Sequence, residues 1–291
     1  MRVPLGEKLF YLFNYMILLF AGLSCILPLV HLVALSFSSG DAILSGKVGL
    51  WPVEWTWISF KNLLQGTNIV VAFRNSVVLT VVGTVLSMLF TILAAYPLSK
   101  KYFYLRKPFT LAIVFTMLFP VGLIPNYLLM KGLGLVNTYG AIWLILLIKV
   151  YYMLILRTFF QNIPEELEEA ARMDGCGEWR IILNIVMPLS VPVLVTLSLF
   201  YGVDQWNAFY HVLIYINDSN KFNLAVVVQN MIRSQSILQE MGQLNPEDFA
   251  NVSSESIKAA GVIVMTLPML AIYPFLQKYF MKGVMLGAVK G

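Results

Sequence analysis

Six long apolar stretches constrain the fold of this chain more than any other feature. The hydrocarbon core of a bilayer is roughly 30 Å thick and takes about 20 apolar residues of helix to cross. The stretches are continuous and do not alternate with polar residues, so they predict helices and not the strands of a membrane barrel. The chain is 59% hydrophobic and 12% charged, whereas soluble domains carry about 25% charged residues. We therefore predict an all-α membrane protein, a single domain over residues 1–291, with six transmembrane helices at about 10–36, 75–98, 109–130, 139–158, 185–206 and 257–279.

The distribution of Lys and Arg predicts the orientation of these helices. Cytoplasmic loops carry an excess of Lys and Arg over outer loops. With the N-terminus inside, twelve of the 20 basic residues fall in inner segments and seven in outer segments, and Lys149 lies within a span. The strongest indication is one short inner loop that holds Lys100, Lys101, Arg106 and Lys107. We expect both termini in the cytoplasm.

Several classes of function lack the residues that they need. Basic residues at the membrane edges explain the net charge of +5, and no basic stripe interleaved with aromatic residues indicates nucleic acid. The two cysteines, Cys25 and Cys176, and the two histidines, His31 and His211, do not have the spacing of a metal site. The sequence has no GxxxxGKS/T phosphate loop, no HExxH and no GxSxG. We expect no metal, no resident cofactor and no enzymatic activity in this chain.

The second inner loop, about 161–184, is the most informative segment. Pro164 suits the first turn of a helix, because the N–H that proline lacks would have no helical partner there. Asp174-Gly175 predicts where that helix stops, since glycine takes the left-handed cap conformation at no steric cost. A second helix is expected to restart near Glu178 and to run into the fifth span. On these features alone, the first helix would be an ordinary surface helix.

A spaced pattern within this loop is more specific. It consists of Glu169-Ala170-Ala171, three residues, Gly175, nine residues, Ile185, one residue and Met187-Pro188. The pattern resembles the EAA loop of bacterial ABC importer permeases, EAA-x3-G-x9-I-x-LP, with Met187 in place of leucine. The resemblance covers essentially all 291 residues. Within that group the chain resembles the MalG-like carbohydrate permeases, in the branch linked to complex or acidic oligosaccharides.

The resemblance implies a type I ABC importer permease fold and a docking role for the loop. The helix at about 164–174 would be a coupling helix that sits in a groove of a separate ATPase subunit, and that subunit would bind ATP and Mg. The residues implied in docking are Glu169, Ala170, Ala171, Asp174, Gly175, Ile185 and Pro188.

The resemblance also implies partners and a location. The partners are a second homologous permease subunit, two ATPase subunits, an extracytoplasmic solute-binding protein, an oligosaccharide and membrane lipid. The location is the bacterial cytoplasmic (inner) membrane, as a multi-pass protein. A channel or secondary carrier that works without ATP is the alternative class, and a docking helix argues against it.

Polar side chains within the spans are the candidates for a substrate path. A lysine near the bilayer centre costs about 2.5–3.5 kcal/mol on insertion scales, and such residues usually face a bundle interior or a water-filled path. Lys149 either lines the path, where it would favour an anionic sugar such as an oligouronate, or pairs with a structural carboxylate, for which Asp204 is available. Trp206 either anchors the chain at the membrane interface or stacks on a sugar ring. The path candidates are Asn126, Lys149, Tyr152, Asp204, Gln205, Trp206 and Asn207.

These features predict the membrane subunit of an ATP-driven oligosaccharide importer. The chain would form half of the translocation path and would contact the ATPase through the EAA loop. An acidic oligosaccharide is the favoured substrate, because of Lys149. A neutral oligosaccharide or another polar solute is the alternative.

Overall fold

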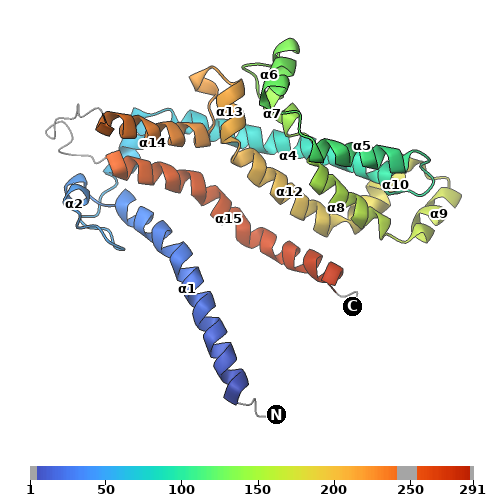
Figure 1. Cartoon of the computed structure of the whole chain (residues 1–291), viewed down its shortest axis with the longest axis horizontal. Coiled ribbons are helices and arrows are strands. Elements are labelled where there is room, and N and C mark those ends of the chain that lie inside the picture. Colours follow the sequence, from blue (N-terminus) through green and yellow to red (C-terminus); the bar gives the residue numbers. More distant parts are fainter. Residues whose placement is uncertain (1–4, 241–253, 289–291) are drawn as a thin grey trace. The chain divides into compact units, whose positions relative to one another are not determined.

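The computed structural model of the chain describes residues 5–240 and 254–288, which are helical or irregular and contain no strand (Figure 1). Two compact units are formed, one by Met1–Val70 with Val227–Leu267 and the other by Val71–Val226 with Pro268–Gly291. We call them the first and the second unit. The prediction of an all-α chain is confirmed for the described residues, while the prediction of one domain stays a prediction.

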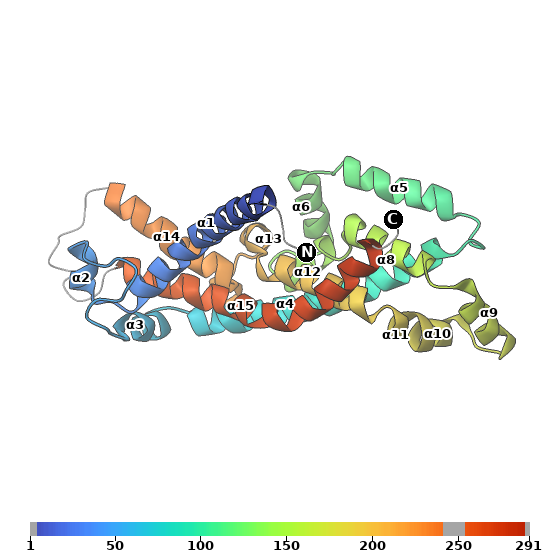
Figure 2. The same ribbon diagram turned by 90° about the horizontal axis from the view of Figure 1, so that it is seen from below.

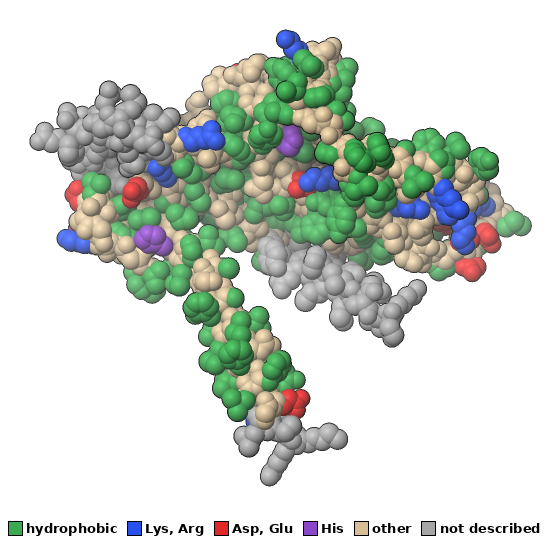
Figure 3. Space-filling model, viewed as in Figure 1, with side chains coloured by type: hydrophobic (Ala, Val, Ile, Leu, Met, Phe, Trp, Pro, Cys, Tyr) green, Lys and Arg blue, Asp and Glu red, His purple; other side chains and the backbone are tan. Residues whose placement is uncertain are grey.

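Among the described residues, three helices are long and apolar enough to cross a membrane without a break. They are α1 (Leu5–Ser36), α4 (Ile69–Ser99) and α15 (Ser254–Ala288). They contain the first, second and sixth predicted spans. The apolar window of α1 has none of its residues buried in the chain, and Figure 3 shows hydrophobic side chains along that helix. This exposure is what a helix that faces lipid requires.

The other three predicted spans are pairs of helices joined at sharp bends. The pairs are α5 (Arg106–Leu118) with α6 (Leu123–Gly132) at 112°, α7 (Tyr139–Ile145) with α8 (Val150–Gln161) at 53°, and Glu178–Leu189 with α12 (Val191–Trp206) at 85°. The described residues therefore hold three unbroken apolar helices and three broken ones. Six complete spans, with both termini inside, stay a prediction.

The break between α5 and α6 follows from the local sequence. Pro120 and Gly122 lie within the third apolar stretch, and neither residue suits the interior of a helix. Gly122 has φ +89°, in the left-handed region that glycine enters without steric cost, and α6 begins directly after it.

The fifth predicted span, about 185–206, lies in one of the bent pairs and stays a prediction. The chain bends at Ser190, between Leu189 and the start of α12. Pro192 cannot donate to the Pro188 carbonyl, as a continuing helix would require, and its place in the first turn of α12 makes the missing N–H harmless. The segment before the bend comprises α10 (Glu178–Ile181), the π-helical η1 (Ile182–Val186) and α11 (Met187–Leu189).

The remaining helices of the described chain are shorter. They are α2 (Gly40–Leu44), α3 (Ile58–Gly66), α9 (Glu165–Met173), α13 (Phe209–Tyr215), η2 (Ser219–Lys221) and α14 (Leu224–Glu240). In the second unit, α9, α10 and α11 lie together at one end (Figures 1 and 2). The core of that unit next to them is apolar and includes Met153, Leu156, Phe160, Ile181, Val186 and Leu197.

Candidate functional site

The predicted coupling helix is present as α9, within one residue of its expected bounds. Its end follows the predicted glycine cap. Gly175 has φ +78°, its N–H donates to the Arg172 carbonyl at 3.0 Å, and the Cys176 N–H donates to the Ala171 carbonyl at 2.9 Å. These two bonds form the Schellman pattern, which satisfies carbonyls that the helix leaves without partners. The turn angles the chain into α10, and the predicted restart near Glu178 is confirmed.

The outward face of α9 carries part of the predicted docking set. Glu169 and Ala170 are exposed, and Met173, 88% exposed, extends the same surface with an apolar side chain. Ala171 instead lies in the apolar core of the second unit. This face is therefore a charged and apolar surface at the end of the unit, where acidic and basic side chains gather in Figure 3.

The remaining docking candidates lie on both sides of the α9 turn. Asp174 and Pro188 are exposed. Ile185 lies in η1 and packs against the core, half-buried. The structure thus places the exposed members at the surface and uses Ala171 and Ile185 for packing, and contact of any of them with an ATPase stays a prediction.

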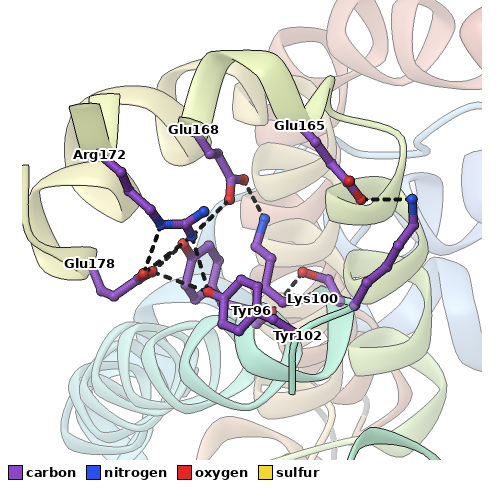
Figure 4. Close-up of polar contacts among 9 residues, drawn as sticks. Tyr96, Lys100, Tyr102, Glu165, Glu168, Arg172 and Glu178 are labelled. Atoms are coloured by element: carbon purple, nitrogen blue, oxygen red, sulfur yellow. Dashed lines mark hydrogen bonds and ion pairs between the residues drawn. The ribbon is translucent and has the colours of Figure 1, made fainter. Parts of the chain in front are cut away.

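The opposite face of α9 carries a polar cluster that sequence reasoning missed (Figure 4). Lys100 forms an ion pair with Glu168, and their side chains are only 10% and 5% exposed. The Arg172 guanidinium lies 3.6 Å from the Glu168 carboxylate and 3.1 Å from the Glu178 carboxylate. We call this group, with the phenols of Tyr96 and Tyr102, the inner cluster.

The two phenols complete the bonds of Glu178. The Tyr96 hydroxyl donates to the Glu178 carboxylate at 2.7 Å, and the Tyr102 hydroxyl lies 3.4 Å from the same oxygen while it accepts from Arg172 at 3.1 Å. Burial and the negative charge of Glu178 raise the pKa of the Tyr102 phenol above its ordinary value, so it stays a donor. One sequence signal was available, because Glu168 and Arg172 are four residues apart and share a helix face.

A second polar group lies at the break between α7 and α8. The Lys149 backbone N–H donates to the Tyr201 hydroxyl at 3.0 Å, and Ser87 donates to the Leu146 carbonyl at 3.2 Å. Tyr201 and Thr91 share a hydrogen bond of 2.7 Å. Backbone groups freed inside an apolar span need such partners, because no water reaches them in lipid. Side chains of α4 and α12 therefore support the break.

The structure brings three predicted path residues together at this break. The Lys149 ammonium lies 2.6 Å from an Asp204 carboxylate oxygen, to which the Tyr152 hydroxyl donates at 3.0 Å. The same ammonium lies 5.4 Å from the centre of the Tyr152 ring. The side chains of Lys149 and Asp204 are 38% and 26% exposed. The pairing that the sequence left open is present, and the group remains accessible from one side.

The other path candidates are not part of this group of contacts. Gln205 is fully buried against Gly83 of α4, and its amide has no hydrogen-bond partner within the described part of the chain. Trp206 is buried beside the ring of Phe73 at 6.0 Å. Asn207 is exposed at the end of α12, and the half-buried Asn126 lies in α6. Sugar contacts by these residues stay predictions.

The arrangement of the described helices is suited to a membrane. Within residues 5–240 and 254–288, no three His, Cys, Asp or Glu side chains lie close enough to hold a metal ion. Apolar helices, broken helices with supported backbone groups and a capped helix at one end of the unit agree with the membrane subunit of a transporter. The chain belongs to the family of binding-protein-dependent transport system inner membrane components, whose pattern matches residues 87–286. It is a permease subunit and not an enzyme.

Known relatives match over nearly the whole chain. The polygalacturonan/rhamnogalacturonan transport system permease protein YtcP of Bacillus subtilis (strain 168) is 39% identical, over 98% of this chain and 99% of the relative. Protein LplC of the same strain is 38% identical, over 98% and 96%. The fold is similar to a chain in the crystal structure of a bacterial ABC transporter involved in the import of the acidic polysaccharide alginate. That chain is 28% identical, with a TM-score of 0.89 over 96% of this chain and 99% of the other.

Proposed function

We propose that this chain is one of two membrane subunits of an ATP-driven importer of acidic oligosaccharides. The observation that carries the proposal is the match to a polygalacturonan/rhamnogalacturonan permease at 39% identity over almost the full length of both chains. Polygalacturonan is a polymer of uronic acid, and the structural relative belongs to an importer of another acidic polysaccharide. The shared feature of these substrates is a carboxylate on the sugar.

The Lys149 group supports an acidic substrate. The ammonium lies at a break within an apolar span and is partly exposed. A sugar carboxylate that reaches it would take the place of Asp204 as its partner. Because the Tyr152 hydroxyl also bonds Asp204, that carboxylate would keep one donor during the exchange. The pair therefore holds the cation ready without leaving an unpaired charge in the membrane.

The loop around α9 supports coupling to an ATPase. The Glu169 side of α9 is exposed and its end is fixed by the Gly175 turn. We propose that this face docks on one of two ATPase subunits, which bind ATP and Mg, while a second homologous permease completes the path. An extracytoplasmic solute-binding protein delivers the sugar, in agreement with the family to which the chain belongs. The assembly lies in the bacterial cytoplasmic membrane, with six spans and both termini of this chain inside.

The test is uptake by the reconstituted complex. The chain is co-expressed with a second permease, the ATPase and the binding protein from its own source, and the complex is inserted into liposomes. We expect ATP-dependent uptake of labelled trigalacturonate and at least tenfold slower uptake of a neutral galactose trisaccharide of the same length. Uptake that does not need the ATPase would refute the importer. Faster uptake of the neutral sugar would refute the acidic substrate and would support the neutral alternative.

A further inference from the structure

We propose that Lys100 and Glu168 are positioning residues that fasten the coupling helix to the end of α4, so that ATPase-driven movement of α9 reaches α4 directly. The inference rests on the proposed function and goes beyond it, because it names the mechanical link inside this chain. Lys100 directly follows α4, and Glu168 lies on the side of α9 opposite the proposed docking face.

Because this ion pair is buried, it holds α9 firmly to the end of α4. Its two side chains are 10% and 5% exposed, so both charges are largely shielded from water while α9 lies against the end of α4. Separation would take from Lys100 its carboxylate partner and leave Glu168 with only the Arg172 guanidinium at 3.6 Å, which costs more than breaking a pair at the surface. The pair therefore favours movement of α9 together with the end of α4 over movement of α9 alone.

Arg172 extends the link to the next helix. It lies one turn after Glu168 on α9 and contacts the carboxylates of both Glu168 and Glu178. Glu178 begins α10 and accepts a hydrogen bond from Tyr96 of α4. The inner cluster thus contains two cations and two carboxylates, and it ties α4, α9 and α10 to one another (Figure 4).

A third contact ties the helix that precedes the loop. Arg157 of α8 donates from Nε to the Leu98 carbonyl at 2.9 Å. Carbonyls in the last turn of a helix have no partner within that helix, so this bond also caps the end of α4. The end of α4, together with Lys100 directly after it, therefore holds two segments. They are α8, which leads into the loop, and α9 itself.

The same helix connects this end of the unit to the break that carries Lys149. Ser87 and Thr91 lie earlier in α4. Ser87 donates to the Leu146 carbonyl, and Thr91 shares a hydrogen bond with the Tyr201 hydroxyl, which accepts from the Lys149 backbone N–H. Movement of α4 thus acts on the break through two hydrogen-bonded side chains.

A nearby ion pair supplies a matched control. Lys101 and Glu165 join the same two segments at 2.9 Å, but their side chains are 75% and 60% exposed. In the reconstituted complex, we compare Lys100→Met and Glu168→Gln with Lys101→Met and Glu165→Gln, and we measure sugar imported per ATP hydrolysed in equal amounts of assembled complex. We expect this ratio to fall at least about fivefold in the first two variants, the lower end of ordinary coupling between sites. The two control variants should keep the wild-type ratio.

The ratio separates positioning from folding. If the pair only stabilises the fold, the variants assemble in smaller amounts but each assembled complex transports at the wild-type ratio, which overturns the inference. Failure of every inner-pair variant to assemble, while the controls assemble, also assigns the pair to folding and overturns it. Wild-type uptake is measured first. If it fails, the proposed function falls, whereas normal uptake with an unchanged ratio in all variants overturns only the positioning role.

Discussion

Replacing Lys149 by methionine separates its two roles, pairing with Asp204 and binding an acidic sugar. Methionine keeps an unbranched, flexible stem and removes only the charge. The ion pair is short, at 2.6 Å, but its side chains are 38% and 26% exposed. Exposed pairs contribute about 0–1 kcal/mol, and removing one partner of a fully buried pair costs about 3–5 kcal/mol. Because this pair lies between the two cases, we expect Lys149→Met to lose about 2 kcal/mol of stability.

The double variant Lys149→Met with Asp204→Asn removes the unpaired carboxylate as well. The amide that replaces this carboxylate retains an oxygen that accepts from Tyr152, so most of the lost stability should return. Substrate binding should not return, because the cation is still absent. A charge-assisted hydrogen bond contributes about 1.5–3 kcal/mol, which corresponds to about a 10- to 100-fold loss.

Two measurements on the reconstituted complex separate the loss of stability from the loss of substrate binding. Thermal unfolding of the purified complex reports stability, and we expect the midpoint to fall by about 4–8 °C in the single variant and to recover in the double variant. Uptake of trigalacturonate should be low in both variants, while uptake of a neutral trisaccharide should follow stability alone. Import of the acidic sugar at the wild-type rate by the stable double variant would refute the role of Lys149 as a substrate ligand.

Three further changes test the geometry. Gly175→Ala places a Cβ at φ +78° in open space, so only the backbone conformation costs energy, about 1–2 kcal/mol. ATPase co-purification and sugar uptake should fall together in this variant. Both should fall less in Gly175→Asn, because asparagine tolerates this conformation. Gly83→Ala brings a Cβ to 2.5 Å from the buried Gln205 amide carbon and should destabilise the complex by about 1–3 kcal/mol in thermal unfolding. Gly202→Ala, whose nearest neighbour would lie at 3.7 Å, should leave the unfolding midpoint almost unchanged, and equal effects of these two variants would contradict the packing of α4 on α12. Tyr201→Phe removes the acceptor of the Lys149 N–H and should cost about 1–3 kcal/mol, seen as faster hydrogen exchange at the break and not at the end of α9.

Local chemistry explains which parts of the fold the sequence predicts well. The end of α9 depends on one glycine that needs a left-handed conformation, and the break before α6 depends on Pro120 and Gly122. Each signal lies within a few residues of the feature that it produces. The break before Lys149 has no such signal, since no proline or glycine lies between α7 and α8. Its partners, Ser87 and Tyr201, come from distant parts of the chain.

The same limit applies to the depth of polar groups in the membrane. Straight helices would place Lys149 and Asp204 at different depths, so their pairing could only be one alternative at the sequence level. The predicted spans that hold these two residues are bent, by 53° before α8 and by 85° before α12. Hydropathy does not report these bends, because it shows only that each stretch is long enough.

Glu168 and Glu169 show why a motif finds one face of a helix and misses the other. Adjacent helix positions lie about 100° apart, so the two carboxylates point in different directions. The Glu-Ala-Ala pattern includes Glu169, which is exposed and suited to contact another subunit, and it excludes Glu168, which is buried against Lys100. A docking helix has to satisfy two surfaces at once. It must present an outward face to the ATPase and must also be held firmly from within, because a helix that yields on its inner side would absorb the movement that it is meant to pass on.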